Sequence, residues 1–272
     1  MEVKFIKASP TENMTLLIET PVAREKQLAV AERLIAYGSV YAEQAGYIEE
    51  AENPAAEKRL QMMAGEFCGN ASLSLAAWLA QKKNLQIGEK TEITLEVSGA
   101  EELVRCEMKR EAEHRFLGRV AMPLPQTIEK RAFTLDGERI ELTAVVFAGI
   151  THILVPASLW GENAVRKAEH AARVWAKELP PVFGLLLFDE KEKSLKPLVA
   201  VGDVSLIWER GCSSGTSAVG AYLAAREKKD VTVSLKQPGG VMHATVSYQN
   251  GAVTKIEITG SVAIVAEGTA YL

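Results

Sequence analysis

The chain has 272 residues, of which 47% are hydrophobic and 24% charged, enough to bury the core of one large domain or two ordinary ones. Its formal net charge of −4 includes no basic cluster, which argues against a nucleic-acid partner. No secretory signal pattern and no apolar run of transmembrane length is present, so we expect a cytoplasmic protein with no membrane partner. Three cysteines are too few for a disulfide framework and should be free thiols.

Strand-like and helix-like segments alternate through the first half of the chain. NMTLLIETP, from residue 13, reads as a strand that ends in proline, and residues 23–37 read as a helix. GYIEEAE and LQMMAGEFC read as two further strands, the second of which runs into Cys68 and an apolar helix. TEITLEVSGAEELVRCEM then reads as two strands joined by a glycine-containing turn, and its Cys106 alternates with apolar residues. We therefore expect Cys106 to be buried and structural.

The second half repeats this order at an offset of 212 − 68 = 144 residues. The matching segments are THILVP, a helix over 162–179, FGLLLFDE, SLIWERGC, an apolar helix after Cys212, and VTVSLKQPGGVMHATV. Two copies of one unit predict an α+β protein of two pseudo-symmetric lobes, residues 1–122 and 123–261. In each lobe a mostly antiparallel sheet should wrap around the apolar helix, and both cysteines should face one shared cleft.

Each cysteine stands at or just before a helix start, where Asn70 and either Ser213 or Ser214 are N-cap candidates. A helix start offers unpaired N–H groups and partial positive charge, which lower a thiol pKa and bind a carboxylate. We expect the N–H groups of Gly69, Asn70, Ser213 and Ser214 to hold one α-carboxylate. One cysteine, as thiolate, would then remove the α-proton while the other, as thiol, protonates the opposite face. The alternative is that both cysteines only cap helices.

At these motifs the chain resembles the diaminopimelate epimerase and proline racemase superfamily. CGN at 68–70 and ERG at 209–211 are similar to epimerase segments, and CSSGTSA at 212–218 is similar to the second cysteine motif of proline racemases. The combined pattern is most similar to the histidine racemases of opine-metallophore biosynthesis. The resemblance implies a cofactor-independent enzyme that interconverts L- and D-histidine through Cys68 and Cys212. It also implies a homodimer and a last strand, 262–272, that returns to the N-terminal lobe.

The resemblance further implies that four side chains contact the substrate: Asn13, Gln44, Glu209 and Arg210. The chain departs from the epimerases where they carry asparagines for the distal end of diaminopimelate. Phe183 stands near one such position, and GITH at 149–152 replaces Gly-Asn-Pro-His. These departures argue against diaminopimelate as the substrate. Histidine, whose imidazolium Glu209 could pair with and Phe183 could stack on, is implied by the resemblance alone, and diaminopimelate or another amino acid is the alternative. His152, in an apolar run, reads as a core histidine.

Two alternatives belong to other functional classes. Gly211, Ser213 and Gly215 satisfy G-x-S-x-G, and Asp230 and His243 follow in the chain order of a hydrolase triad. Alternatively, the protein is an amino-acid-binding relative that has lost catalysis. The motifs typical of metal, nucleotide and pyridoxal phosphate sites are missing, so we expect no metal and no cofactor. The expected partner is a small-molecule substrate, an amino acid.

Overall fold

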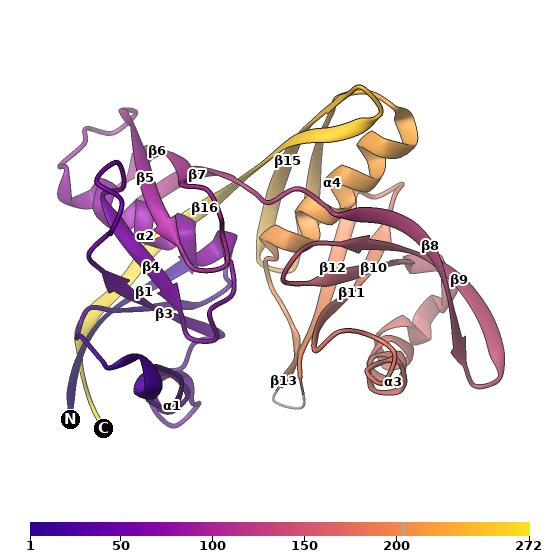
Figure 1. The fold of residues 1–272 in the computed structure, drawn as a ribbon, viewed down its shortest axis with the longest axis horizontal. Coiled ribbons are helices and arrows are strands. Elements are labelled where there is room, and N and C mark those ends of the chain that lie inside the picture. Colours follow the sequence, from indigo (N-terminus) through magenta and orange to yellow (C-terminus); the bar gives the residue numbers. More distant parts are fainter. Residues whose placement is uncertain (203–204) are drawn as a thin grey trace. The chain divides into compact units, whose positions relative to one another are not determined.

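The computed structural model describes residues 1–202 and 205–272, and the chain divides into two compact units. The first unit contains residues 1–122 and 258–272, and the second contains 123–257. Both are built from strands with a few helices, so the predicted α+β class is confirmed (Figure 1). The first unit includes residues 258–272, within which lies the returning strand, 262–272, that the resemblance implies.

The first unit is a series of strands that closes on itself around a helix. Its elements are β1 (Glu2–Pro10), β2 (Thr15–Ile18), α1 (Arg24–Ile35), β3 (Gln44–Glu49), β4 (Lys58–Met62), α2 (Gly69–Lys82), β5 (Lys90–Val97), β6 (Val104–Ala112), β7 (Arg115–Ala121) and the larger part of β16 (Ala252–Tyr271). Neighbouring strands pair in the order β1 to β7 and then β16, and β16 pairs back with β1. Helix α2 packs against these strands along its length and is almost wholly buried (Figure 1).

The second unit repeats this plan with additions. Its elements are β8 (Thr127–Leu135), β9 (Glu138–Val146), β10 (Thr151–Pro156), α3 (Ala164–Trp175), β11 (Val182–Asp189), β12 (Ser194–Val201), β13 (Ser205–Trp208), α4 (Ser213–Glu227), β14 (Val231–Gln237), β15 (Gly240–Gln249) and the start of β16. The strand order is β16-β15-β14-β12-β11-β10-β9-β8, with β13 paired to β12. Helix α4 packs mainly on β14 and β15.

The repeat predicted from the sequence is present in the strand pairings. β2 pairs in parallel with β3 after the crossover helix α1, as β10 does with β11 after α3. β4 pairs in parallel with β5 after α2, as β12 does with β14 after α4. Parallel neighbours require a crossover connection, so these pairings explain why each unit needs two helices. The remaining pairings of these strands are antiparallel, as predicted.

One equivalence drawn from the sequence is wrong. The sequence repeat aligns LQMMAGEFC, which contains β4, with SLIWERGC, which contains β13. In the structure β12 is the counterpart of β4, because each is antiparallel to the strand before it and parallel to the strand after the central helix. β13 is an additional strand antiparallel to β12. The two segments align in sequence because each leads into a cysteine, although their strand pairings differ.

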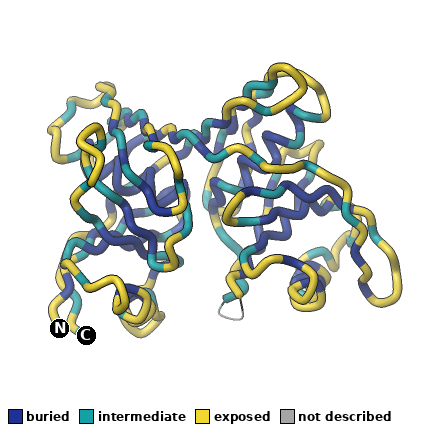
Figure 2. The backbone as a smooth tube through the Cα atoms, in the orientation of Figure 1, coloured by how far each residue is buried: buried dark blue, intermediate teal, exposed yellow. Residues whose placement is uncertain are grey.

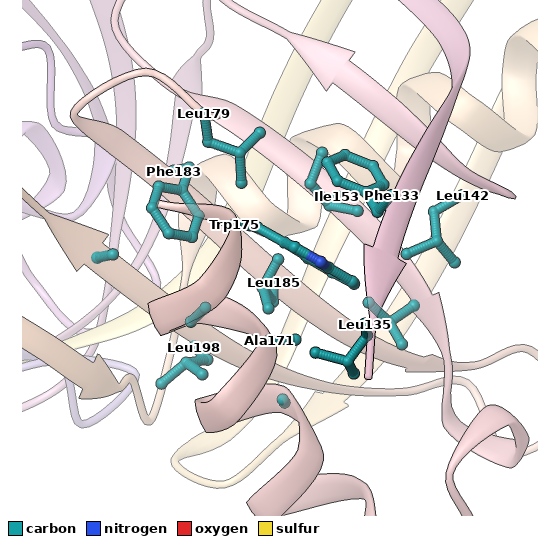
Figure 3. Packing of buried hydrophobic residues seen from close by; sticks show 14 of the residues in the cluster. Phe133, Leu135, Leu142, Ile153, Ala171, Trp175, Leu179, Phe183, Leu185 and Leu198 are labelled. Carbon is teal, nitrogen blue, oxygen red and sulfur yellow. The ribbon is translucent and has the colours of Figure 1, made fainter. Parts of the chain in front are cut away.

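Strands β10 and β11 are covered on one face by α3. The indole of Trp175 packs 4.6 Å from the Phe133 ring, between centroids, inside a cluster of buried apolar side chains (Figure 3). Phe183 belongs to this cluster and is only 2% exposed. The expectation that Phe183 stacks on a substrate ring is therefore wrong. It failed because alternate residues of a strand point to opposite faces, and the sequence did not show which face α3 covers.

The other face of β11 turns toward α4. A Cβ at Gly215 of α4 would lie 3.0 Å from Leu186, and one at Gly220 would lie 2.9 Å from both Ala244 and Val246 of β15. Small residues therefore bring the helix close to its strands, as its composition indicates. Figure 2 shows the buried strands in each unit and the exposed loops that join them. Among the described residues, no helix is both long enough and apolar enough to cross a membrane.

Candidate active site

Cys68 and Cys212 occupy the same structural position in their units, as the N-cap residues of α2 and α4. Their backbone angles are nearly equal, with φ −135° and ψ 112° for Cys68 and φ −122° and ψ 108° for Cys212. Each sulfur accepts the N–H of the third helical residue, Ala71 at 3.4 Å and Gly215 at 3.2 Å. A cysteine thus does the capping that serine or asparagine usually does.

The expected caps, Asn70 and Ser213 or Ser214, lie inside the first helical turns. The sequence misled because those residue types are the preferred caps, whereas here the sulfur takes that role. The first N–H groups of a helix have no acceptor within the helix, and in α2 and α4 the earliest belong to Gly69, Asn70, Ser213 and Ser214. These groups carry the positive end of each helix dipole beside a sulfur.

In the first unit Cys68 is joined to two other predicted site residues. Its Sγ donates to Oε1 of Gln44 at 3.0 Å, and Nε2 of Gln44 donates to Oδ1 of Asn13 at 3.0 Å. Nε2 also donates to Oγ1 of Thr15 at 2.9 Å. Asn13, between β1 and β2, and Thr15, the first residue of β2, are fully buried, whereas Cys68 is half-buried. The structure therefore brings Asn13, Gln44 and Cys68 together, and Thr15 is a participant that sequence reasoning missed.

In the second unit Cys212 is 3% exposed and has a carboxylate beside it. Burial raises the pKa of the Cys212 thiol well above its usual value, and the charge of Glu209 and a hydrogen bond to that carboxylate raise the pKa further. Hydrogen bonds from Ser214 and from the Gly215 N–H act in the opposite direction. Burial and Glu209 favour the thiol and outweigh the two donors, which favour the thiolate.

Two residues of the β14–β15 hairpin region support this helix start. The N–H of Cys212 donates to Oε1 of Gln237 at 2.9 Å, and Nε2 of Gln237 donates to Oγ1 of Thr216 at 2.7 Å. Arg210 donates through Nη2 to the carbonyl of Pro238 at 3.2 Å. Sequence reasoning missed Gln237; its place at the end of a strand beside a Pro-Gly-Gly turn is the only signal the sequence holds.

His152 was expected to be a core histidine, and it is fully buried on β10. Burial lowers its pKa to about 3, so the ring is neutral near pH 7. Its Nε2 lies 2.9 Å from Oγ of Ser214, which in turn lies 3.5 Å from Sγ of Cys212. His152 therefore borders the helix start, which the apolar run around it did not reveal.

The remaining cysteine and the candidate metal ligands can be placed as well. None of the three cysteines forms a disulfide, and burial on β6 raises the pKa of the Cys106 thiol to about 12. Cys106 is therefore the structural residue that its alternation predicted. Within 1–202 and 205–272, no group of three histidine, cysteine or acidic side chains is arranged to hold a metal ion.

The hydrolase triad suggested by the sequence is not assembled. His243 Nδ1 lies 2.7 Å from Oγ of Ser234, its neighbour across the β14–β15 ladder. Asp230 accepts the N–H of Tyr248 at 2.8 Å. Met242, next to His243, points inward to Thr216 of α4, so His243 points to the opposite face of the strand. The G-x-S-x-G match therefore marks only a tight helix start.

Comparison with known proteins gives a family for the whole chain. A family model described as the histidine racemase CntK N-terminal domain matches residues 2–271. A histidine racemase of Fusobacterium nucleatum subsp. nucleatum is 32% identical over 275 residues, which cover 98% of this chain and 97% of that protein. A histidine racemase of Staphylococcus aureus is 27% identical, covering 99% and 98% respectively.

Solved structures show the same fold at low sequence identity. A probable proline racemase from Agrobacterium radiobacter superposes with a TM-score of 0.73 at 16% identity, covering 99% of this chain and 92% of that one. A hydroxyproline epimerase from Agrobacterium vitis gives 0.73 at 13% identity, covering 100% and 93%. A phenazine biosynthesis protein of the PhzF family from Bacillus anthracis gives 0.69 at 14% identity, covering 100% of each.

Proposed function

The chain belongs to the histidine racemase family and is an amino-acid racemase, and from this premise we propose that it interconverts L- and D-histidine with two cysteines and no cofactor. The observation that carries the proposal is the matched capping of α2 and α4 by Cys68 and Cys212. Two equivalent sulfurs, each at a helix start, suit a reaction that must treat the two faces of one carbon alike.

The proposed step is a proton transfer at the α-carbon. One cysteine, as thiolate, takes the α-proton, and the electron pair of the broken C–H bond delocalises into the substrate carboxylate. The other cysteine, as thiol, gives its proton to the opposite face of the same carbon, so the configuration inverts. The two sulfurs finish with exchanged protonation states, and the reverse reaction begins from that state. No electrons are lost or gained.

The carboxylate becomes more negative as the α-proton leaves, so groups that bind it gain most in the transition state. We propose that the N–H groups of Gly69, Asn70, Ser213 and Ser214 supply this stabilisation. The Glu209 carboxylate, beside Cys212, is the group proposed to hold a positive part of the substrate. When Glu209 pairs with such a charge, its effect on the Cys212 pKa is reduced, which favours the thiolate when substrate is bound.

Histidine is proposed as the substrate because the relatives from Fusobacterium nucleatum and Staphylococcus aureus described above are histidine racemases. The chain also lacks asparagines at positions where diaminopimelate epimerases carry them. By the same resemblance, D-histidine would be the product supplied to opine-metallophore assembly. Diaminopimelate and other amino acids are the substrates against which histidine must be tested.

The test is exchange of the α-proton in deuterated water, followed by NMR. Purified, reduced protein is incubated separately with L-histidine, L-proline, meso-diaminopimelate, L-glutamate and L-lysine. We expect loss of the α-proton signal with histidine and formation of D-histidine. Cys68→Ser and Cys212→Ser should each lower racemisation at least about 100-fold, the usual contribution of a positioned acid or base.

Cys106→Ala is the matched control, because it removes a buried thiol without touching either helix start. It should keep wild-type racemisation per folded molecule. Exchange with a different amino acid would replace histidine and retain the mechanism. Full racemisation by Cys68→Ser or Cys212→Ser would refute the two-cysteine mechanism.

A further inference from the structure

The proposed reaction gives His152 no role. The buried His152 ring is nevertheless connected to the sulfur of Cys212 through the hydroxyl group of Ser214. His152 Nε2 lies 2.9 Å from Ser214 Oγ, and Ser214 Oγ lies 3.5 Å from Cys212 Sγ. His152 is 0% exposed on β10, and Ser214 stands in the first turn of α4. The three side chains form one continuous series inside the second unit.

The surroundings of Nδ1 indicate which ring nitrogen carries the proton. Among the described residues, Nδ1 of His152 is buried and has no hydrogen-bond partner. It faces Gly184, its register partner on β11, where a Cβ would lie 2.4 Å from the nitrogen. The α-hydrogen of Gly184 points along that direction, which suits a lone pair and would collide with an N–H. The single proton of the neutral ring therefore lies on Nε2.

This placement sets the direction of the remaining hydrogen bonds. Nε2–H donates to the hydroxyl oxygen of Ser214, so the hydroxyl proton is left to point at the neighbouring sulfur of Cys212. The N–H of Gly215 also points at this sulfur, at 3.2 Å. Two donors thus converge on Cys212 Sγ, and donors favour the charged form of their acceptor. They oppose Glu209, the charged group that faces the sulfur and favours the thiol.

We propose that His152 is a positioning residue that, through Ser214, holds a hydroxyl proton on the Cys212 sulfur and so favours its thiolate form. At Cys68 the sulfur accepts the N–H of Ala71 and donates to Gln44. The role in catalysis rests on the proposed function, whereas the effect on the Cys212 thiol does not.

The test measures the Cys212 thiol directly, in full-length chains that also carry Cys68→Ser and Cys106→Ala. The rate of alkylation by iodoacetamide is measured as a function of pH. The pH at half-maximal rate, the midpoint, reports the formation of the thiolate, because the accessibility of the sulfur scales the rate equally at every pH. We expect His152→Phe and Ser214→Ala each to raise the midpoint by about one pH unit, the size of a hydrogen bond to a charged group. The double variant should shift no further than Ser214→Ala alone, since both act in one series.

His152→Gln keeps an N–H donor and should recover most of the shift. Ser217→Ala is the matched control, because this buried hydroxyl one turn along α4 donates to the carbonyl of Ser213 at 2.9 Å and should leave the midpoint unchanged. An unchanged midpoint in Ser214→Ala, or additive shifts in the double variant, would overturn the proposal. Should His152→Phe fail to fold, Ser214→Ala and His152→Gln decide by the same criteria.

Racemisation is measured in the same variants with Cys68 and Cys106 restored. We expect His152→Phe to lower kcat about tenfold with little change in KM, since it alters a sulfur and not the binding of the carboxylate. A midpoint shift in a protein that racemises no amino acid would refute the proposed function and retain the assignment of His152. Racemisation of histidine with no midpoint shift in the variants would refute the assignment of His152 and retain the proposed function.

Discussion

The thiol of Cys68 is the donor in its hydrogen bond with Gln44, because Thr15 fixes the orientation of the Gln44 amide. Thr15 donates its hydroxyl proton to the backbone carbonyl of Asn13 at 3.2 Å, so its oxygen is left to accept from Gln44 Nε2. The amide nitrogen is thereby held toward Thr15, and Oε1 faces the sulfur at 3.0 Å. Thr15, the first residue of β2, thus favours the thiol form of Cys68 through the orientation of Gln44.

A carboxylate in place of this amide should hold the proton on Cys68 more strongly. Gln44→Glu puts a negative charge against the sulfur, and like charge disfavours the thiolate. We expect the pH midpoint of Cys68 alkylation to rise by about one unit in chains that also carry Cys106→Ala and Cys212→Ser. Gln86→Glu, an exposed change of the same charge, is the control. Equal midpoints in the two variants would show that Gln44 does not face the sulfur in solution.

The turn at Gly99 should be intolerant of a side chain. Gly99 has φ +72°, and a Cβ there would lie 2.3 Å from the backbone nitrogen of Phe67, in the segment that leads to Cys68. We expect Gly99→Ala to lower the free energy of unfolding by about 2–4 kcal/mol through backbone strain and overpacking. Gly88→Ala, at φ +91° with open space around it, isolates the strain and should cost about 1 kcal/mol.

Urea denaturation of both variants measures the difference. Because Phe67 must move to admit the new methyl group, Gly99→Ala should also lower kcat more than Gly88→Ala does. Two variants of equal stability and activity would contradict the close packing of this turn on the approach to Cys68.

Acid should destabilise the protein partly through His152. Its pKa is lowered from 6.5 to about 3 in the folded chain, so between these values the unfolded chain binds the extra proton. The stabilising contribution is complete above pH 6.5 and is lost as the pH falls toward 3, by up to about 1.4 kcal/mol per pH unit. His152→Gln should therefore flatten the decline in unfolding free energy measured by urea titration at successive pH values below 6.5.

Other groups also titrate in acid, so the informative quantity is the difference in slope between the variant and the wild type. His114→Gln, on an exposed turn, is the control for the exchange of histidine for glutamine. A His152→Gln protein with the wild-type slope would mean that the ring accepts a proton without unfolding.

The structural features that the sequence predicted correctly are those that depend on local residue patterns. The apolar helices after Cys68 and Cys212, the outer helices and the alternating strands follow from periodicity, and their order along the chain disclosed the repeat. The buried role of Cys106 followed from alternation on a single strand. Each of these signals lies within one element or within a repeat of elements.

The features that the sequence predicted wrongly or did not reveal depend mostly on contacts between different strands and helices. Which strand is the counterpart of β4 is a matter of pairing, and β13 could not be recognised as an addition from its own residues. Phe183 turned out to face α3, and His152 to reach Ser214, because of which strand faces lie against which helices. The capping sulfurs were hidden by the stronger statistical preference for serine and asparagine at that position.

Strand β16 has a consequence for the way the chain is made. Its residues up to 257 belong to the second unit and those from 258 belong to the first, where they pair with β1 up to the register of Tyr271 with Glu2. A ribosome releases β1 to β7 first, but the strand that joins β7 to β1 emerges only after all the other strands of the second unit. Until then both flanking strands present open edges, the kind of surface that invites mispairing. The unit that is synthesised first is therefore completed last.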